Sequence, residues 1–125
     1  MIKSVVVPHF VGDQREFERL QQVLAELGFR AGEGWADERG KGSPHVTGMG
    51  AIELFQGQAP VEAELLVEVD DVGRALEIVR KHQLQCSREL MQTHWDSTYF
   101  VVDLGAKRIA FFQFNQQSRS EPKAA

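Results

Sequence analysis

Two short segments of the chain are near copies of each other and differ at one residue that could do chemistry. The first, AIELFQG at 51–57, carries Glu53, and the second, RIAFFQF at 108–114, carries Ala110 at the matching place. A carboxylate can bind a cation or accept hydrogen bonds, whereas a methyl group can do neither. A divalent ion in a protein normally needs at least about three protein ligands. The difference therefore bears on whether the chain holds a metal ion and is an enzyme.

Aromatic side chains accompany these segments and favour an organic ligand. Phe112 and Phe114 share a strand face with Ala110, because alternate residues of a strand point to the same side. Tyr99 alternates with the phenylalanine that follows it, so one of these two rings faces the same side. Trp35, in a glycine-rich stretch, either lines a pocket or covers a sheet edge. Such an apolar surface suits an organic molecule better than a hydrated ion.

Three further candidates have simpler interpretations. The run GKGS at 40–43 lacks the spacing of a phosphate-binding loop, and we interpret it as a mobile loop. Cys86 has no histidine near it in the sequence and is interpreted as a buried inert thiol rather than a nucleophile. His94 and Trp95 could stack on a ligand, but a turn before a strand is the simpler interpretation.

Length, composition and charge limit the class of protein. The chain has 125 residues, 42% hydrophobic and 26% charged, which suits one globular domain with a core. The net charge of -4 argues against nucleic acid or an anionic membrane as partner, since both select basic surfaces. One cysteine cannot form an internal disulfide, and neither a membrane span nor a signal-peptide pattern is found. We therefore expect a soluble, cytoplasmic protein.

The hydrophobic pattern predicts the same order of elements twice. In the first half we expect a strand ended by Pro8, a helix capped by Asp13 and stopped by Gly28, two irregular strands, and a last strand. These elements occupy, in order, 4–7, 13–28, 30–50 and 51–55. In the second half a strand, a helix capped by Asp70 or Asp71, and three strands follow. These occupy 63–69, 72–82, 85–92, 98–104 and 108–114.

We interpret this order as an internal duplication. One domain at 1–115 would consist of two modules, 1–58 and 59–115, followed by a flexible tail at 116–125. Two similar α+β units should pair their sheets and enclose a shared cavity.

Three stretches resemble one known family. GAIELFQG, EVDDV and YFVVDLGAKRIAFFQ are similar to segments of the vicinal oxygen chelate superfamily. That superfamily includes glyoxalase I, bleomycin and fosfomycin resistance proteins, and ring-cleaving dioxygenases. The resemblance spans the chain except for 30–48 and the tail. It implies an α+β fold in which two βαβββ modules form a curved mixed sheet around a cleft, and it implies a homodimer.

The resemblance also implies where metal ligands would stand. In metal-bearing members the ligands lie on the first and last strands of each module and are usually His or Glu. The matching positions here are Glu53, Glu64 and Ala110, and the fourth falls where nothing can chelate. His9 or His45 would have to complete the set, and both stand in stretches interpreted as loops.

We therefore expect a small organic molecule to bind in the cleft, without a complete metal site. The residues expected to line the cleft are Glu53, Glu64, Phe55, Ala110, Phe112, Trp35 and Tyr99. The first alternative is a lyase, isomerase or dioxygenase of the same superfamily that depends on Fe, Ni, Zn or Mn. The second is a non-catalytic, ferredoxin-like regulatory module, because two rounds of strand, helix and strands also describe that fold.

Overall fold

The computed structural model describes residues 1–48, 50–57, 62–93 and 96–115. Within these ranges the chain forms two helices and nine strands. It divides into two compact units, one of Ser4–Ala59 and one of Met1–Lys3 with Pro60–Ala125. We call them the first and the second module. The positions expected for the tail, 116–125, lie outside the described residues.

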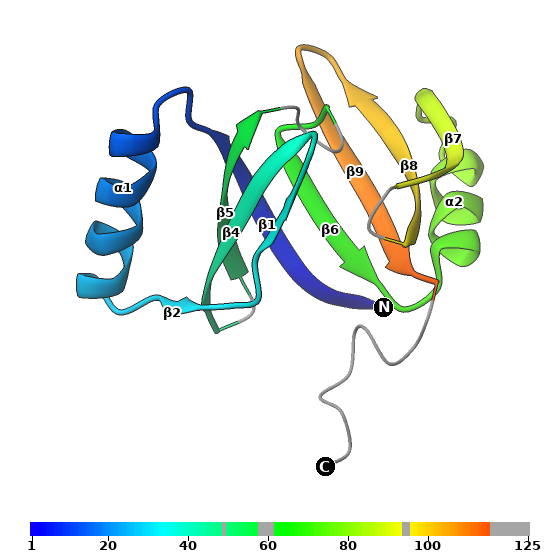
Figure 1. Ribbon diagram of the computed structural model, residues 1–125. Coiled ribbons are helices and arrows are strands. Elements are labelled where there is room, and N and C mark those ends of the chain that lie inside the picture. The colour runs from blue at the N-terminus through cyan, green and yellow to red at the C-terminus, as the bar shows by residue number, and fades with distance from the viewer. Residues whose placement is uncertain (49, 58–61, 94–95, 116–125) are drawn as a thin grey trace. The chain divides into compact units, whose positions relative to one another are not determined.

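The first module combines one helix with strands of mixed direction. Its elements are β1 (Ile2–Phe10), α1 (Gln14–Glu26), β2 (Arg30–Ala31), β3 (Trp35–Asp37), β4 (Gly40–Thr47) and β5 (Gly50–Gly57). β1 runs parallel to β5, and β4 runs antiparallel to β5. The short strands β2 and β3 both pair with β4 in antiparallel fashion. Figure 1 shows α1 along one side of these strands.

Helix α1 begins and packs as its sequence predicts. The Asp13 carboxylate accepts a hydrogen bond from the backbone N–H of Arg15 at 2.8 Å, which caps the helix. Phe17 and Leu24, one side of the helix, are buried against Leu54 of β5. The face of β5 that carries Leu54 is therefore the face covered by α1.

The second module repeats this arrangement. Its elements are β6 (Leu65–Val69), α2 (Val72–Lys81), β7 (Cys86–Gln92), β8 (Ser97–Leu104) and β9 (Lys107–Phe114). β6 runs parallel to β9, while β8 pairs antiparallel with both β9 and β7. Asp71 caps α2 through the N–H of Arg74 at 3.0 Å. The core lies between α2 and one face of the strands, around Val69, Leu76 and Phe100.

The two helix ends are closed in the same way. In each, the amide three residues past the last helical residue donates to a carbonyl in the last turn: Phe29 to Leu24 at 3.0 Å, and Leu84 to Val79 at 3.2 Å. The residue that reverses the chain has a positive φ in both cases, 107° at Gly28 and 60° at Gln83. The two modules thus close their helices with the same backbone geometry.

The predicted fold class, α+β with two βαβββ modules and mixed strands, is confirmed. The strands of the first module follow the order β2-β4-β5-β1, and those of the second follow β7-β8-β9-β6. Each module holds one helix in the described residues. A ferredoxin-like module would instead pack two helices on one four-stranded sheet, so this alternative is not supported. Neither described helix is long and apolar enough to cross a bilayer.

Three local predictions were wrong. β1 does not end before Pro8 but continues to Phe10, since one proline removes at most one hydrogen bond from the strand ladder. The stretch 30–50 holds three strands rather than two. The run at 40–43 lies in β4 and is no loop. Its glycine at position 40 permits close packing, because a Cβ there would lie 2.0 Å from the carbonyl oxygen of Gln56.

Candidate functional site

Glu53 lies at the centre of β5, on the face that α1 leaves open. Neighbouring residues of a strand point to opposite sides, and Leu54 faces α1, so Glu53 and Phe55 face away from it. The paired residues on the adjacent strands are Pro8 of β1 and Pro44 of β4. The side chain of Glu53 is half-buried. The structure therefore places this carboxylate on a helix-free face of the first module.

Trp35 supplies a hydrogen bond to this carboxylate. The indole Nε1–H donates to Oε2 of Glu53 at 3.2 Å. Burial raises the pKa of Glu53 above its ordinary value, and the hydrogen bond from Trp35 partly opposes that rise. The rings of Trp35 and Phe55 lie 6.2 Å apart, centroid to centroid, with their planes tilted by 50°. A desolvated carboxylate thus stands beside two aromatic rings.

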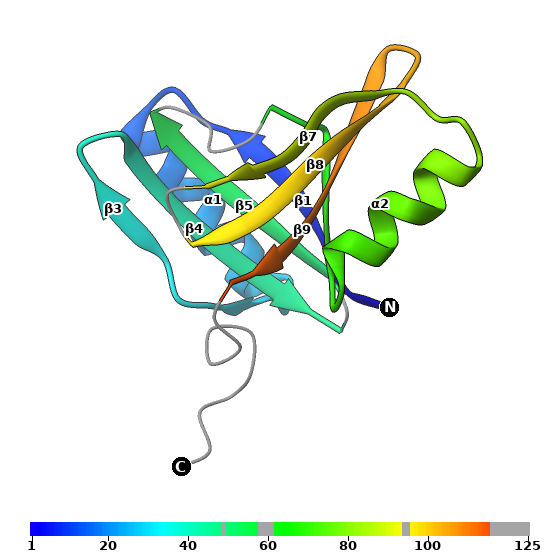
Figure 2. The ribbon, with the colours of Figure 1, turned by 90° about the vertical axis from the view of Figure 1, so that its right-hand side faces the viewer.

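Gly42 makes room for this contact. It is paired with Trp35 across the β3–β4 hairpin, which Figure 2 shows at one side of the first module. A Cβ at this position would lie 2.2 Å from the indole Nε1 and 3.0 Å from Oε2 of Glu53. The indole therefore rests directly on the backbone of β4. We call Trp35, Gly42, Glu53 and Phe55 the Trp35–Glu53 cluster.

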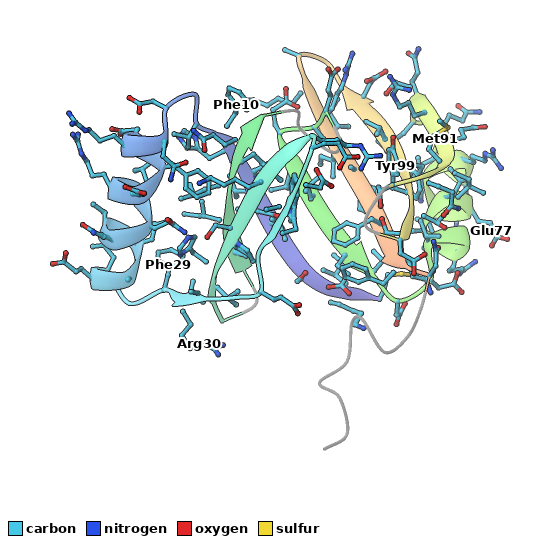
Figure 3. The ribbon with its side chains drawn as sticks, viewed as in Figure 1. Phe10, Phe29, Arg30, Glu77, Met91 and Tyr99 are labelled. Atoms are coloured by element: carbon cyan, nitrogen blue, oxygen red, sulfur yellow. The ribbon has the colours of Figure 1, made fainter. Side chains whose placement is uncertain are left out.

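Phe10, which the sequence analysis did not select, extends this aromatic surface. It is paired in register with Phe55 and is 59% exposed. Figure 3 labels it at the end of β1. The exposed ring of Phe10 thus continues the apolar face that Phe55 begins. No sequence signal distinguished Phe10 from core phenylalanines, because its exposure depends on which residues end β1.

The candidates of the second module occupy a comparable face. Phe100 packs into the core at α2, so Tyr99 faces the opposite side, where it is paired with Phe112. Both rings are buried, and Ala110 is 0% exposed. Figure 3 shows Tyr99 on β8. This face is thus apolar where the resemblance implied a ligand at Ala110.

The carboxylate of Glu64 accepts a hydrogen bond from the backbone. Glu64 is exposed just before β6, and its Oε2 accepts a hydrogen bond from the N–H of Arg108 at 2.7 Å. That bond lowers the pKa of Glu64. Glu68, two positions past Leu66 on the same face, is the more buried carboxylate of this strand and lies 3.8 Å from Nζ of Lys3. The family resemblance selected Glu64 and not Glu68, because the burial of Glu68 is visible only in the structure.

Neither candidate histidine lies beside Glu53. The prediction that His9 and His45 stand in loops was wrong, since they lie in β1 and β4. They are paired with Leu54 and Ile52 respectively, so both are on the opposite side of the strands from Glu53. Among the described residues no group of three His, Cys, Asp or Glu side chains could hold a metal ion. The described donor set therefore does not fit a resident divalent ion.

His45 instead belongs to a buried polar chain under α1. It is 2% exposed, and its Nε2 lies 2.9 Å from Oγ of Ser43, which accepts a hydrogen bond from Nε2 of Gln21 at 3.0 Å. Its Nδ1 is buried and has no partner in the described part of the chain. Burial lowers the pKa of His45, so the ring is held neutral.

Three sequence candidates remain, and the structure describes one of them. Cys86 begins β7 and is half-buried, and burial raises the pKa of its thiol. His94 and Trp95 lie outside the described residues.

Known proteins were compared with the chain and its structure. No family model matches the sequence, and no curated protein does. Solved structures match over nearly the whole chain. Methylmalonyl-CoA epimerase from Mycobacterium tuberculosis is 10% identical with a TM-score of 0.66, and covers 96% of this chain and 91% of its own. The chain has the vicinal oxygen chelate fold. The expected resemblance is thereby confirmed for the fold.

Two further solved structures resemble this chain in fold. A Streptomyces coelicolor methylmalonyl-CoA epimerase in complex with 2-nitronate-propionyl-CoA is 9% identical, with a TM-score of 0.67 and coverage of 93% and 100%. A hypothetical protein from Bacillus halodurans is 11% identical, with a TM-score of 0.66 and coverage of 94% and 96%. At such identities the likeness concerns the fold and not the reaction.

Proposed function

We propose that this protein binds a small organic molecule on the helix-free face of its first module. The Trp35–Glu53 cluster is the observation that carries the proposal. A half-buried carboxylate with one hydrogen bond from an indole, beside two aromatic rings, can accept hydrogen bonds from a ligand and contact its apolar body. Solved neighbours with this fold support a small-molecule ligand, since methylmalonyl-CoA epimerases were crystallised with 2-nitronate-propionyl-CoA and with methylmalonyl-CoA.

The proposal includes neither a metal nor a reaction step. Among the described residues no three His, Cys, Asp or Glu side chains come together as a metal site would require. The predicted cleft residues Glu64, Ala110, Phe112 and Tyr99 remain proposals as ligand contacts. So do a homodimer and a cytoplasmic location. Light scattering after gel filtration would test the dimer.

Thermal-shift measurements with a panel of aromatic, cationic and thiol compounds test the proposal. A ligand that binds only the folded chain raises the midpoint in proportion to the logarithm of its concentration. We expect Phe10→Ala and Trp35→Ala to reduce the shift. Leu27→Ala removes another exposed apolar side chain, at the end of α1, and should leave the shift unchanged. A panel in which no compound stabilises the chain would count against the proposal.

A further inference from the structure

We infer that the Trp35–Glu53 cluster selects an organic cation, an ammonium or quaternary ammonium group on a small apolar body. This inference rests on the proposed function and narrows the class of ligand. It uses three properties of the cluster, which are the unpaired charge of Glu53, the position of the rings, and the absence of a competing cation among the described residues.

No cation in the described part of the chain is paired with the carboxylate of Glu53. Trp35 gives it one hydrogen bond, and no described Lys, Arg or His forms an ion pair with it. A carboxylate moved out of water is destabilised unless a charge or several hydrogen bonds compensate it. A bound cation would supply that compensation, whereas a neutral ligand would desolvate the carboxylate further.

The aromatic rings beside Glu53 favour the same ligand. Trp35 and Phe55 form a corner with centroids 6.2 Å apart, and exposed Phe10 is paired with Phe55. The face of an aromatic ring attracts a cation, and indole does so most strongly. An organic ammonium group can therefore contact the indole of Trp35 and the carboxylate at once, which a metal ion with its water shell cannot do. Phe55 is buried and supports the indole from below rather than touching the ligand.

The lysine of β4, Lys41, cannot serve as the cation beside Glu53. Lys41 is paired with Gln56, so it points to the other side of the strands from Glu53. There its Nζ lies 4.4 Å from the centre of the Phe17 ring and donates to Oε1 of Gln14. The residues paired with Glu53 itself, Pro8 and Pro44, do not titrate.

Calorimetric titration of the full chain with matched probes tests the inference. Choline is compared with dimethylbutanol, its uncharged carbon isostere, and benzylammonium is compared with benzyl alcohol. We expect each cation to bind at least about tenfold more tightly than its neutral partner. Glu53→Gln keeps the side-chain shape and should remove this preference. Glu77→Gln makes the same charge change on the outer side of α2 (Figure 3) and should leave it intact.

A choline titration of the unmodified chain at several pH values gives a second readout. The charge of choline does not change with pH, so its affinity should fall as the pH falls and Glu53 becomes protonated. Equal binding of cation and neutral partner, unaltered by Glu53→Gln, would overturn the inference and leave the proposed function standing. If no probe binds and no compound of the wider panel stabilises the chain, both are overturned.

Discussion

The substitution Gly42→Ala tests how tightly the Trp35–Glu53 cluster is packed. The added methyl carbon would lie 2.2 Å from the indole Nε1, 2.6 Å from Cε2, and 3.0 Å from Oε2 of Glu53. Ordinary contacts between such atoms need about 3.5 Å. The indole must therefore move by more than its hydrogen bond to Glu53 tolerates. The backbone of Gly42 itself has no positive φ, so alanine introduces no strain of its own.

Two effects determine how much Gly42→Ala changes the free energy of unfolding. Loss of a hydrogen bond to a charged group destabilises a protein by about 1.5–3 kcal/mol. Replacement of glycine by alanine stabilises by about 0.4–1 kcal/mol through the unfolded chain. We expect a net decrease of about 1–2 kcal/mol in the free energy of unfolding. Gly12→Ala is the matched control, because nothing lies within 4 Å of its added carbon, and it should be neutral or slightly stabilising.

Urea unfolding followed by circular dichroism measures this difference. The decisive variant is the double mutant with Trp35→Ala, in which the ring that clashes is gone. If the clash is the cause, Gly42→Ala has little effect in that background, and the coupling energy is about 1 kcal/mol or more. Equal destabilisation in both backgrounds would refute the reasoning, as would a single mutant as stable as the parent.

Three further predictions concern the cores and the duplication. Burial lowers the pKa of His45 below its ordinary 6.5, so the unfolded chain binds a proton first. The free energy of unfolding should therefore decrease as the pH falls below about 6.5. In pH-dependent urea titrations His45→Leu should remove this decrease and His82→Gln, at an exposed position, should not. By the same measurement at neutral pH, Gln83→Gly should stabilise by about 0.5–1 kcal/mol and Gly28→Ala should destabilise by about 1 kcal/mol, since only glycine adopts positive φ freely. A stabilising Gly28→Ala would contradict this. Ala110→Glu would restore the missing carboxylate at a 0% exposed position and should destabilise by about 3 kcal/mol or more; a stable variant that binds Zn²⁺ would show that the position tolerates a ligand.

The fold was predictable where burial repeats with the period of the backbone. Phe17 and Leu24 recur at helical spacing, and Leu65, Val67 and Val69 alternate along β6, so the sequence alone indicated which faces are buried. These local patterns, written twice, also predicted the duplication.

The stretch 30–50 was less predictable because its glycines make room for atoms that are distant in the sequence. Gly40 and Gly42 leave room for a carbonyl of β5 and for an indole of β3, respectively. In the sequence such glycines cannot be told from those of a turn, since the atoms they accommodate come from other strands. The run therefore suggested a loop where β4 lies.

The sequence selected candidate residues for the site but did not predict how they are arranged. Glu53 and Trp35 were each selected, yet their hydrogen bond depends on the register of the β3–β4 hairpin, which places Trp35 opposite Gly42. His45 appeared available to a metal because its strand, and hence its direction, was not recognised. One residue of register moves a side chain to the other face.

The two prolines beside Glu53 have a consequence for local motion. Pro8 and Pro44 lack amide hydrogens, whereas Leu66 and Val101, which flank Ala110 in the second copy of the strand, have them. The centre of β5 is thus joined to its neighbours by fewer potential donors than the centre of β9. We expect amide hydrogens of β5 to exchange with solvent sooner than those of β9. The strand that carries the carboxylate, β5, would then also open locally more often than β9.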